Sequence, residues 1–225
     1  MISLTKKEES YKILLDKNSE DIIIATAQWV DNGDGQENDD LDLRAGLLLP
    51  DGKMVMIHCD SPGDLENKPY ILHLGDIKEA SLNKPGQEIM KVNPKISKHY
   101  NAPIAIVFSV YSAIDNGAVS VASLKPKMKI EYKDKIVECA YDFSSSPINQ
   151  NEKLGFFSKI SNKFKSFGNS YIYTYVLGIV IIKDNEVEIM PSGLTSKPSS
   201  EATPQLKWNN NTIITTVDGP SLFKD

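Results

Sequence analysis

Hydrophobic residues along the chain fall into short segments rich in Val, Ile, Tyr and Phe, separated by Gly, Pro, Asn and Asp. Segments of this length and composition between turn-forming residues are typical of β-strands. We expect strands at 21–29, 41–49, 53–59, 70–74, 88–92, 104–111, 118–122, 128–132, 136–143, 171–182, 187–190 and 212–217. The stretches 49–54 and 183–186 predict hairpin turns. Many short strands with few helices between them predict an all-β protein, an antiparallel β-sandwich.

Two segments have helical rather than alternating patterns. Residues 94–100 (PKISKHY) predict a short helix that ends before Pro103. Residues 151–167 place their apolar side chains along one side of a helix, with lysines beside them. The residues concerned are Phe156, Phe157, Ile160, Phe164 and Phe167, with Lys159 and Lys163. This helix either packs its phenylalanines into the sandwich or lies on an anionic membrane surface or a partner protein.

The composition is that of one globular domain. The chain has 225 residues, of which 40% are hydrophobic and 24% charged, so it can bury a real core. Residues 192–204 lose their periodicity and gain Ser, Pro and Thr, which is typical of a surface loop. We therefore expect a sandwich domain at 1–193 with a helical insertion at 151–168. The remainder, 194–225, is expected to form a loop and a C-terminal strand packed on the same domain.

The charge balance restricts the partners and the location of the protein. Lys and Arg total 25 against 30 Asp and Glu, so no whole-protein positive field is present to hold nucleic acid. The N-terminal residues are charged where a signal peptide is apolar, and the apolar runs are too short to span a membrane. These features predict a cytoplasmic protein. Its two cysteines, Cys59 and Cys139, are then expected to be buried thiols, with His58 and Cys59 on opposite faces of a strand.

An acidic stretch at 31–42 (DNGDGQENDDLD) has six acidic side chains and no basic one. Such a stretch is either a solvated loop or a site where a cation relieves the repulsion between carboxylates. The spacing does not fit an EF-hand loop. Alternation along the following strand predicts Asp40, Asp42 and Arg44 on one face, opposite Leu41 and Leu43. Arg44 is the only arginine in the chain.

The order of these motifs resembles the TerD-like tellurite-resistance and stress proteins, which are calcium-binding β-sandwich domains. The centre of the resemblance is DLDLRAGLLLPDGKM, similar to the Asp-rich strand and turn of that family. The likeness covers roughly residues 2–193. It includes ISLTKKEE, IIIATAQW, HLGDI at 73–77, PGQEIMKVNPKIS at 85–97, IVFSVYSA at 106–113, VSVAS at 119–123 and YTYVLGIVII.

The resemblance implies a calcium site between the Asp-rich strand and the loop that begins with His-x-Gly-Asp. Carried over position by position, the ligands are Asp40 and Asp42 on the strand, Asp76 in HLGDI, and Glu88. Oxygen ligands of this kind suit calcium.

The chain also departs from the family pattern at this site. Arg44 stands where the family commonly has another aspartate, and Gly86 and Gln87 stand where it has acidic residues. Tyr111 and Ser112 replace a His-Asp pair. Each departure removes negative charge and so lowers the expected affinity for calcium. The Arg44 guanidinium is the alternative: an internal cation that neutralises the carboxylates in place of the metal.

The resemblance predicts a non-enzymatic, cytoplasmic stress-response protein of the tellurite-resistance type. Such a protein acts with other proteins of a stress-resistance complex or at the inner membrane face, with calcium as its ligand. Two alternatives stay open. One is a metal-free scaffold or adaptor in which Arg44 replaces the cation. The other is an enzyme that detoxifies an oxyanion through Cys59 or Cys139. No pattern in the sequence indicates an oligomeric state.

Overall fold

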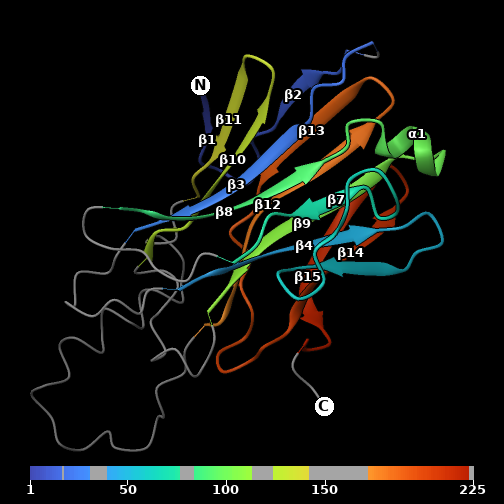
Figure 1. Cartoon of the computed structure of the whole chain (residues 1–225). Helices are drawn as coiled ribbons and strands as arrows, with labels where there is room; N and C mark the ends of the chain where they lie inside the picture. Colours follow the sequence, from blue (N-terminus) through green and yellow to red (C-terminus); the bar gives the residue numbers. More distant parts are fainter. Residues whose placement is uncertain (17, 31–39, 77–83, 113–123, 142–171, 223–225) are drawn as a thin grey trace, which may run out of the picture.

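Two β-sheets packed face to face form the body of the protein (Figure 1). The computed structural model describes residues 1–16, 18–30, 40–76, 84–112, 124–141 and 172–222. Within these residues, one short helix accompanies the strands, and the pairings are antiparallel apart from one parallel edge pair. The prediction of an all-β, antiparallel sandwich is confirmed.

The first sheet has seven strands in the order β1-β11-β10-β3-β8-β7-β6. Its central strand β3 alternates buried and less buried residues and pairs with β10 and β8. The edge pair β1–β11 is the parallel one. The bounds are β1 Ile2–Leu4, β3 Ile23–Trp29, β6 Gly63–Asp64, β7 Ile71–His73, β8 Gly86–Val92, β10 Lys127–Tyr132 and β11 Lys135–Cys139.

The second sheet has six strands in the order β2-β13-β12-β9-β4-β5. Its bounds are β2 Tyr11–Leu14, β4 Asp42–Leu48, β5 Met54–Ile57, β9 Ile104–Tyr111, β12 Thr174–Lys183 and β13 Glu186–Pro191. The predicted turns join β4 to β5 and β12 to β13. In the first of them Gly52 adopts a positive φ of 85°, which glycine allows without strain.

The core lies between the two sheets, and a second cluster lies on the outer face of the six-stranded sheet. Strand β9 is buried along its whole length because alternate residues enter each cluster. Ile106 and Phe108 face the main core, whereas Ala105 and Val107 face outward. This explains why its sequence is almost continuously apolar instead of alternating.

A hairpin near the C-terminus covers that outer face. It consists of β14 (Thr203–Asn209) and β15 (Thr212–Gly219), drawn in red beside β4 in Figure 1. Leu206 is buried in the outer cluster, and Trp208 packs against it. The sequence pattern predicted only the second of these strands and treated residues up to 204 as a loop.

The predicted short helix is present as α1 (Ile96–Tyr100), and it ends at Asn101 in the left-handed conformation. The expected strand at 118–122 and the whole basic aromatic segment at 151–167 lie outside the described residues. Among the described residues, no helix is both long enough and apolar enough to cross a bilayer.

Candidate functional site

Strand β4 presents its polar side chains on the face opposite the core. Leu41, Leu43 and Ala45 are buried between the sheets. Asp42 and Arg44 therefore point to the outer face, as the alternation predicted. On the neighbouring strand β9, Tyr111 lies opposite Asp42 in the register. The outer face at this end of the sheet thus carries three adjoining polar side chains.

Arg44 is buried among these side chains, with only 3% of its surface exposed. Its Cζ lies 3.7 Å from the centre of the Tyr111 ring, a cation–π contact. Its Nη2 lies 3.9 Å from Oδ2 of Asp42. Burial lowers the pKa of Arg44, and the Asp42 carboxylate opposes that effect. A guanidinium remains charged in such surroundings, so Arg44 is a fixed internal cation.

The C-terminal segment closes this arrangement from outside. The Tyr111 hydroxyl donates to Oε1 of Glu201 at 2.9 Å, and the Ser221 hydroxyl donates to Oε2 at 3.0 Å. Burial, and then the Glu201 carboxylate, raise the pKa of Tyr111. The tyrosine is therefore a hydrogen-bond donor that ties the segment before β14 to the end of β9.

Glu88 links the two sheets at the same end of the sandwich. It belongs to β8 in the seven-stranded sheet and is 1% exposed. Its Oε2 accepts a hydrogen bond of 2.6 Å from the backbone N–H of Leu43 on β4. His73 at the end of β7 lies with Nε2 3.3 Å from the same oxygen. On the other side of the ring, Nδ1 of His73 accepts a hydrogen bond of 3.0 Å from the backbone N–H of Gly75.

The negative charges of three other carboxylates act on Asp42, two from the segments after β5 and β7 and one from strand β8. Burial raises the pKa of Asp42, Arg44 lowers it, and the negative charges of Glu88, Asp76 and Asp60 raise it further. The structure therefore brings Asp42, Asp76 and Glu88 close enough to interact, although they come from β4, from the segment after β7 and from β8. Asp40 is partly buried just before β4. Among the described residues, Arg44 is the one cation whose charge acts on Asp42, against the three carboxylates of Glu88, Asp76 and Asp60.

Close contacts account for the residue types at two places near this arrangement. Arg44 and Tyr111 contact each other through their cation–π interaction. Gly86 lies under the indole of Trp29, where a Cβ atom would be 2.2 Å from the ring. An acidic side chain therefore cannot occupy position 86 unless Trp29 moves.

The sequence prediction for Cys59 is wrong. The strand β5 ends at Ile57, and Cys59 lies in the following turn, partly exposed. His58, Cys59 and Asp60 therefore do not project alternately from a strand. Each places a nitrogen, sulfur or oxygen within 4.8 Å of the other two. Cys139 is buried as predicted.

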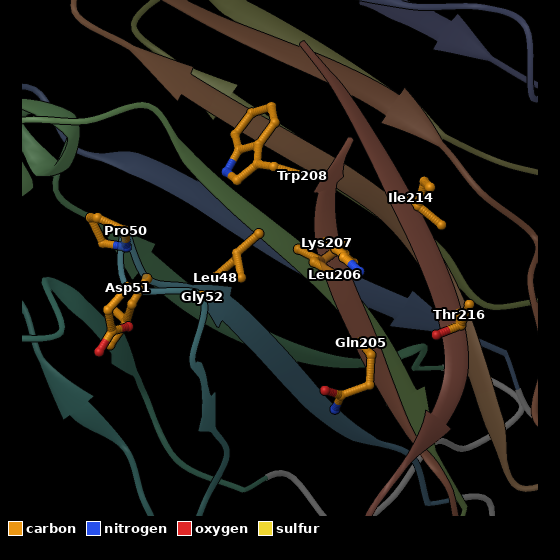
Figure 2. A pocket seen from close by; sticks show the side chains of 11 residues that line it. Leu48, Pro50, Asp51, Gly52, Gln205, Leu206, Lys207, Trp208, Ile214 and Thr216 are labelled. Atoms are coloured by element: carbon orange, nitrogen blue, oxygen red, sulfur yellow. The ribbon is translucent and has the colours of Figure 1, made fainter. Parts of the chain in front are cut away.

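A separate groove lies between the hairpin and the β4–β5 turn and has a volume of about 620 Å³ (Figure 2). Pro50 and Asp51 line one side, and Gln205, Leu206 and Trp208 line the other. Asp51 and Lys207 are its charged residues, and they belong to the two different sides. The groove contains no converging set of acid, base and nucleophile among these lining residues.

Comparisons with known proteins do not assign a family. No family model matches the chain, and no curated protein matches it. Among solved structures, the chain is similar to one described as the crystal structure of an unknown function protein, SAV2460. The TM-score is 0.47 and the identity 17%, over 80% of this chain and 94% of that chain.

Proposed function

We propose that the protein is a non-enzymatic, cytoplasmic stress-response protein of the tellurite-resistance type that binds calcium beside Asp42. Two lines of reasoning support this. The motifs of the sequence resemble that family. The carrying observation is that the negative charges of Asp76 and Glu88, two residues implied by the resemblance, both act on Asp42. They do so together with that of Asp60 and against Arg44, the single cation among the described residues that acts on Asp42.

The donor set suits a hard cation, with different roles for its members. Asp42 is half-buried and Asp76 exposed, so both can offer carboxylate oxygens, the ligands calcium prefers. Glu88 already uses one oxygen to hold the Leu43 amide. We therefore assign Asp42 and Asp76 as ligands, with Asp40 beside them, and Glu88 as the residue that positions β4. A bound ion would supply the positive charge that Arg44 alone does not.

The proposed effect of calcium is to hold the start of β4 against the segment that follows β7. These elements belong to different sheets, so the ion would set the surface that this end of the sandwich offers. We propose that this surface binds other proteins of a stress-resistance complex or the inner face of the membrane.

Calcium titration of chelator-treated protein by calorimetry tests the proposal. We expect the wild type to bind, and Asp42→Asn to weaken the affinity at least about tenfold, because one ligand charge is lost. Asp134→Asn, on an exposed turn between β10 and β11, is the matched control and should leave binding unchanged. Equal affinities for the wild type and Asp42→Asn would contradict the assignment.

The buried Arg44 supports a second candidate, a metal-free scaffold in which the guanidinium replaces the ion. Its cation–π contact and its position beside Asp42 are the observations in its favour. Arg44→Met separates the two candidates. If Arg44 replaces the metal, the wild type gives no calcium signal and Arg44→Met gains one, since the carboxylates lose their internal counterion.

A thiol-dependent enzyme has less support than either of these two candidates. Burial raises the pKa of Cys139 to about 12 and also raises that of Cys59, where nearby carboxylates add to the effect. A raised pKa lowers the fraction of thiolate, which is the reactive form.

A further inference from the structure

The turn after β5 carries three side chains that can bind a metal, those of His58, Cys59 and Asp60, and backbone hydrogen bonds close the turn. His58 and Ser61 exchange two hydrogen bonds, from the His58 N–H to the Ser61 carbonyl at 3.2 Å and from the Ser61 N–H to the His58 carbonyl at 3.0 Å. Cys59 and Asp60 are the two residues between them. The backbone positions of all three side chains are therefore set by the turn before any ligand arrives.

The donor atoms of these side chains lie close to one another. One nitrogen of His58, the sulfur of Cys59 and one oxygen of Asp60 all lie within 4.8 Å of one another. Nδ1 of His58 is 3.9 Å from Oδ2 of Asp60. Donors around one tetrahedral zinc ion, at ~2.0–2.3 Å from it, lie about 3.5 Å apart. Asp60 is 81% exposed, so its side chain is free to rotate over the remaining distance.

We propose that His58, Cys59 and Asp60 form a binding site for a divalent transition metal of the zinc class. A nitrogen, a sulfur and an oxygen donor suit zinc or cobalt, whereas calcium and magnesium take oxygen ligands. Three protein ligands leave a fourth position for water or for a carboxylate brought by another molecule. Among the described residues, this is the group of three such donors that meets the spacing.

The negative charges that act on this turn outnumber the single positive charge of Arg44, which acts on His58. The negative charges of Asp60, Asp42 and Asp76 all act on the Cys59 sulfur. They disfavour a free thiolate, but they attract a divalent ion, and the ion in turn stabilises the thiolate. Binding therefore replaces the Cys59 proton, which is released to solvent. This site is distinct from the calcium ligands proposed above, although Asp42 and Asp76 contribute to the field at both.

Cobalt titration of reduced, tag-free, chelator-treated protein tests the proposal, because a cobalt–thiolate bond gives a near-ultraviolet charge-transfer band. We expect the wild type to show this band, and zinc to abolish it by displacement. Cys59→Ser should remove the band and weaken zinc affinity, measured against a chromophoric chelator, by more than about 100-fold, which exceeds the loss typical of residues that only support ligands. Cys139→Ser is the matched control and should keep both, because its thiol is buried away from the turn.

Two further variants keep the result independent of the calcium proposal. His58→Gln should weaken zinc binding while the thiolate band persists at higher cobalt concentration. Asp42→Asn should retain the band even if it loses calcium. Cobalt binding without a thiolate band, or a band that survives in Cys59→Ser, would overturn the assignment.

Discussion

The two cysteine side chains differ in access rather than in the direction of their pKa shift. Cys59 lies in a partly exposed turn, whereas Cys139 is 1% exposed on β11 within the core. The pKa of each thiol is raised, so at neutral pH both are protonated. Access then decides which of them reacts with an added reagent.

We predict that iodoacetamide labels Cys59 in the folded, metal-free protein and Cys139 only after unfolding. Labelling of Cys59 should be slower than that of a free cysteine at pH 8. Its rate should continue to rise above pH 9.0, the ordinary thiol value, because burial raises the pKa of Cys59 above that value and the thiolate is populated at higher pH. Peptide mass mapping after timed quenching measures both sites. Equal labelling of the two cysteines in the folded protein would contradict the structure.

At the candidate site, the sequence predicted which side chains share a face of β4 but not which distant residues they contact. Alternation placed Asp42 and Arg44 on one face, and local pattern was enough for that. The contact of Arg44 with Tyr111 and the hydrogen bond from Leu43 to Glu88 join residues far apart in the chain, so only the resemblance pointed to Glu88. The cluster around Cys59 was missed because the strand was extended two residues beyond its end at Ile57.

Among the elements, β8 and β3 fit together most tightly where Gly86 meets Trp29. The two residues pair in the register, and the indole covers the glycine. A side chain at position 86 would have to displace a fully buried ring. A larger residue at position 86 therefore requires the indole to move.

We predict that Gly86→Ala destabilises the fold by about 1–3 kcal/mol, the usual cost of overpacking. Urea denaturation followed by far-ultraviolet circular dichroism gives the free energy of unfolding. Gln87→Ala, at the exposed neighbouring position, should change it by less than about 0.5 kcal/mol. A neutral effect of Gly86→Ala would show that the indole has room to shift.

The strands differ in how well the sequence pattern predicted them. Long segments with clear composition, such as β9 and β12, were predicted near their observed bounds. Short strands such as β1, β2 and β6 were missed because so few residues carry little periodicity. Strand β14 was not predicted because the residues before it are rich in Ser and Pro. Its burial also depends on contacts with the six-stranded sheet, which a local pattern does not reveal.

At the scale of the whole molecule, the hairpin turns a two-layer sandwich into a partly three-layer structure. Leu206 packs on Val107 and its neighbours in the outer cluster, and Glu201 bonds to Tyr111 at the end of β9. We therefore expect the hairpin to unfold together with the sandwich.

We predict that Leu206→Ala lowers the free energy of unfolding by about 2–4 kcal/mol, because it removes a buried leucine from that contact. Ile214→Ala on the same hairpin is the control. Its side chain is 46% exposed, so the expected cost is below about 1.5 kcal/mol. Chemical denaturation of both variants measures the difference. Similar costs at the two positions would indicate that the hairpin contributes little to the stability of the sandwich.

The strands nearest the N-terminus pair with partners that come much later in the chain. Strand β1 lies beside β11 at residues 137–139, and β2 lies beside β13 at residues 186–189, so these two strands form one edge of each sheet. On the ribosome, β1 and β2 emerge before these partners and must wait for them before either edge is completed. Until then, the two sheets have open edges that a neighbouring nascent chain or a chaperone can reach.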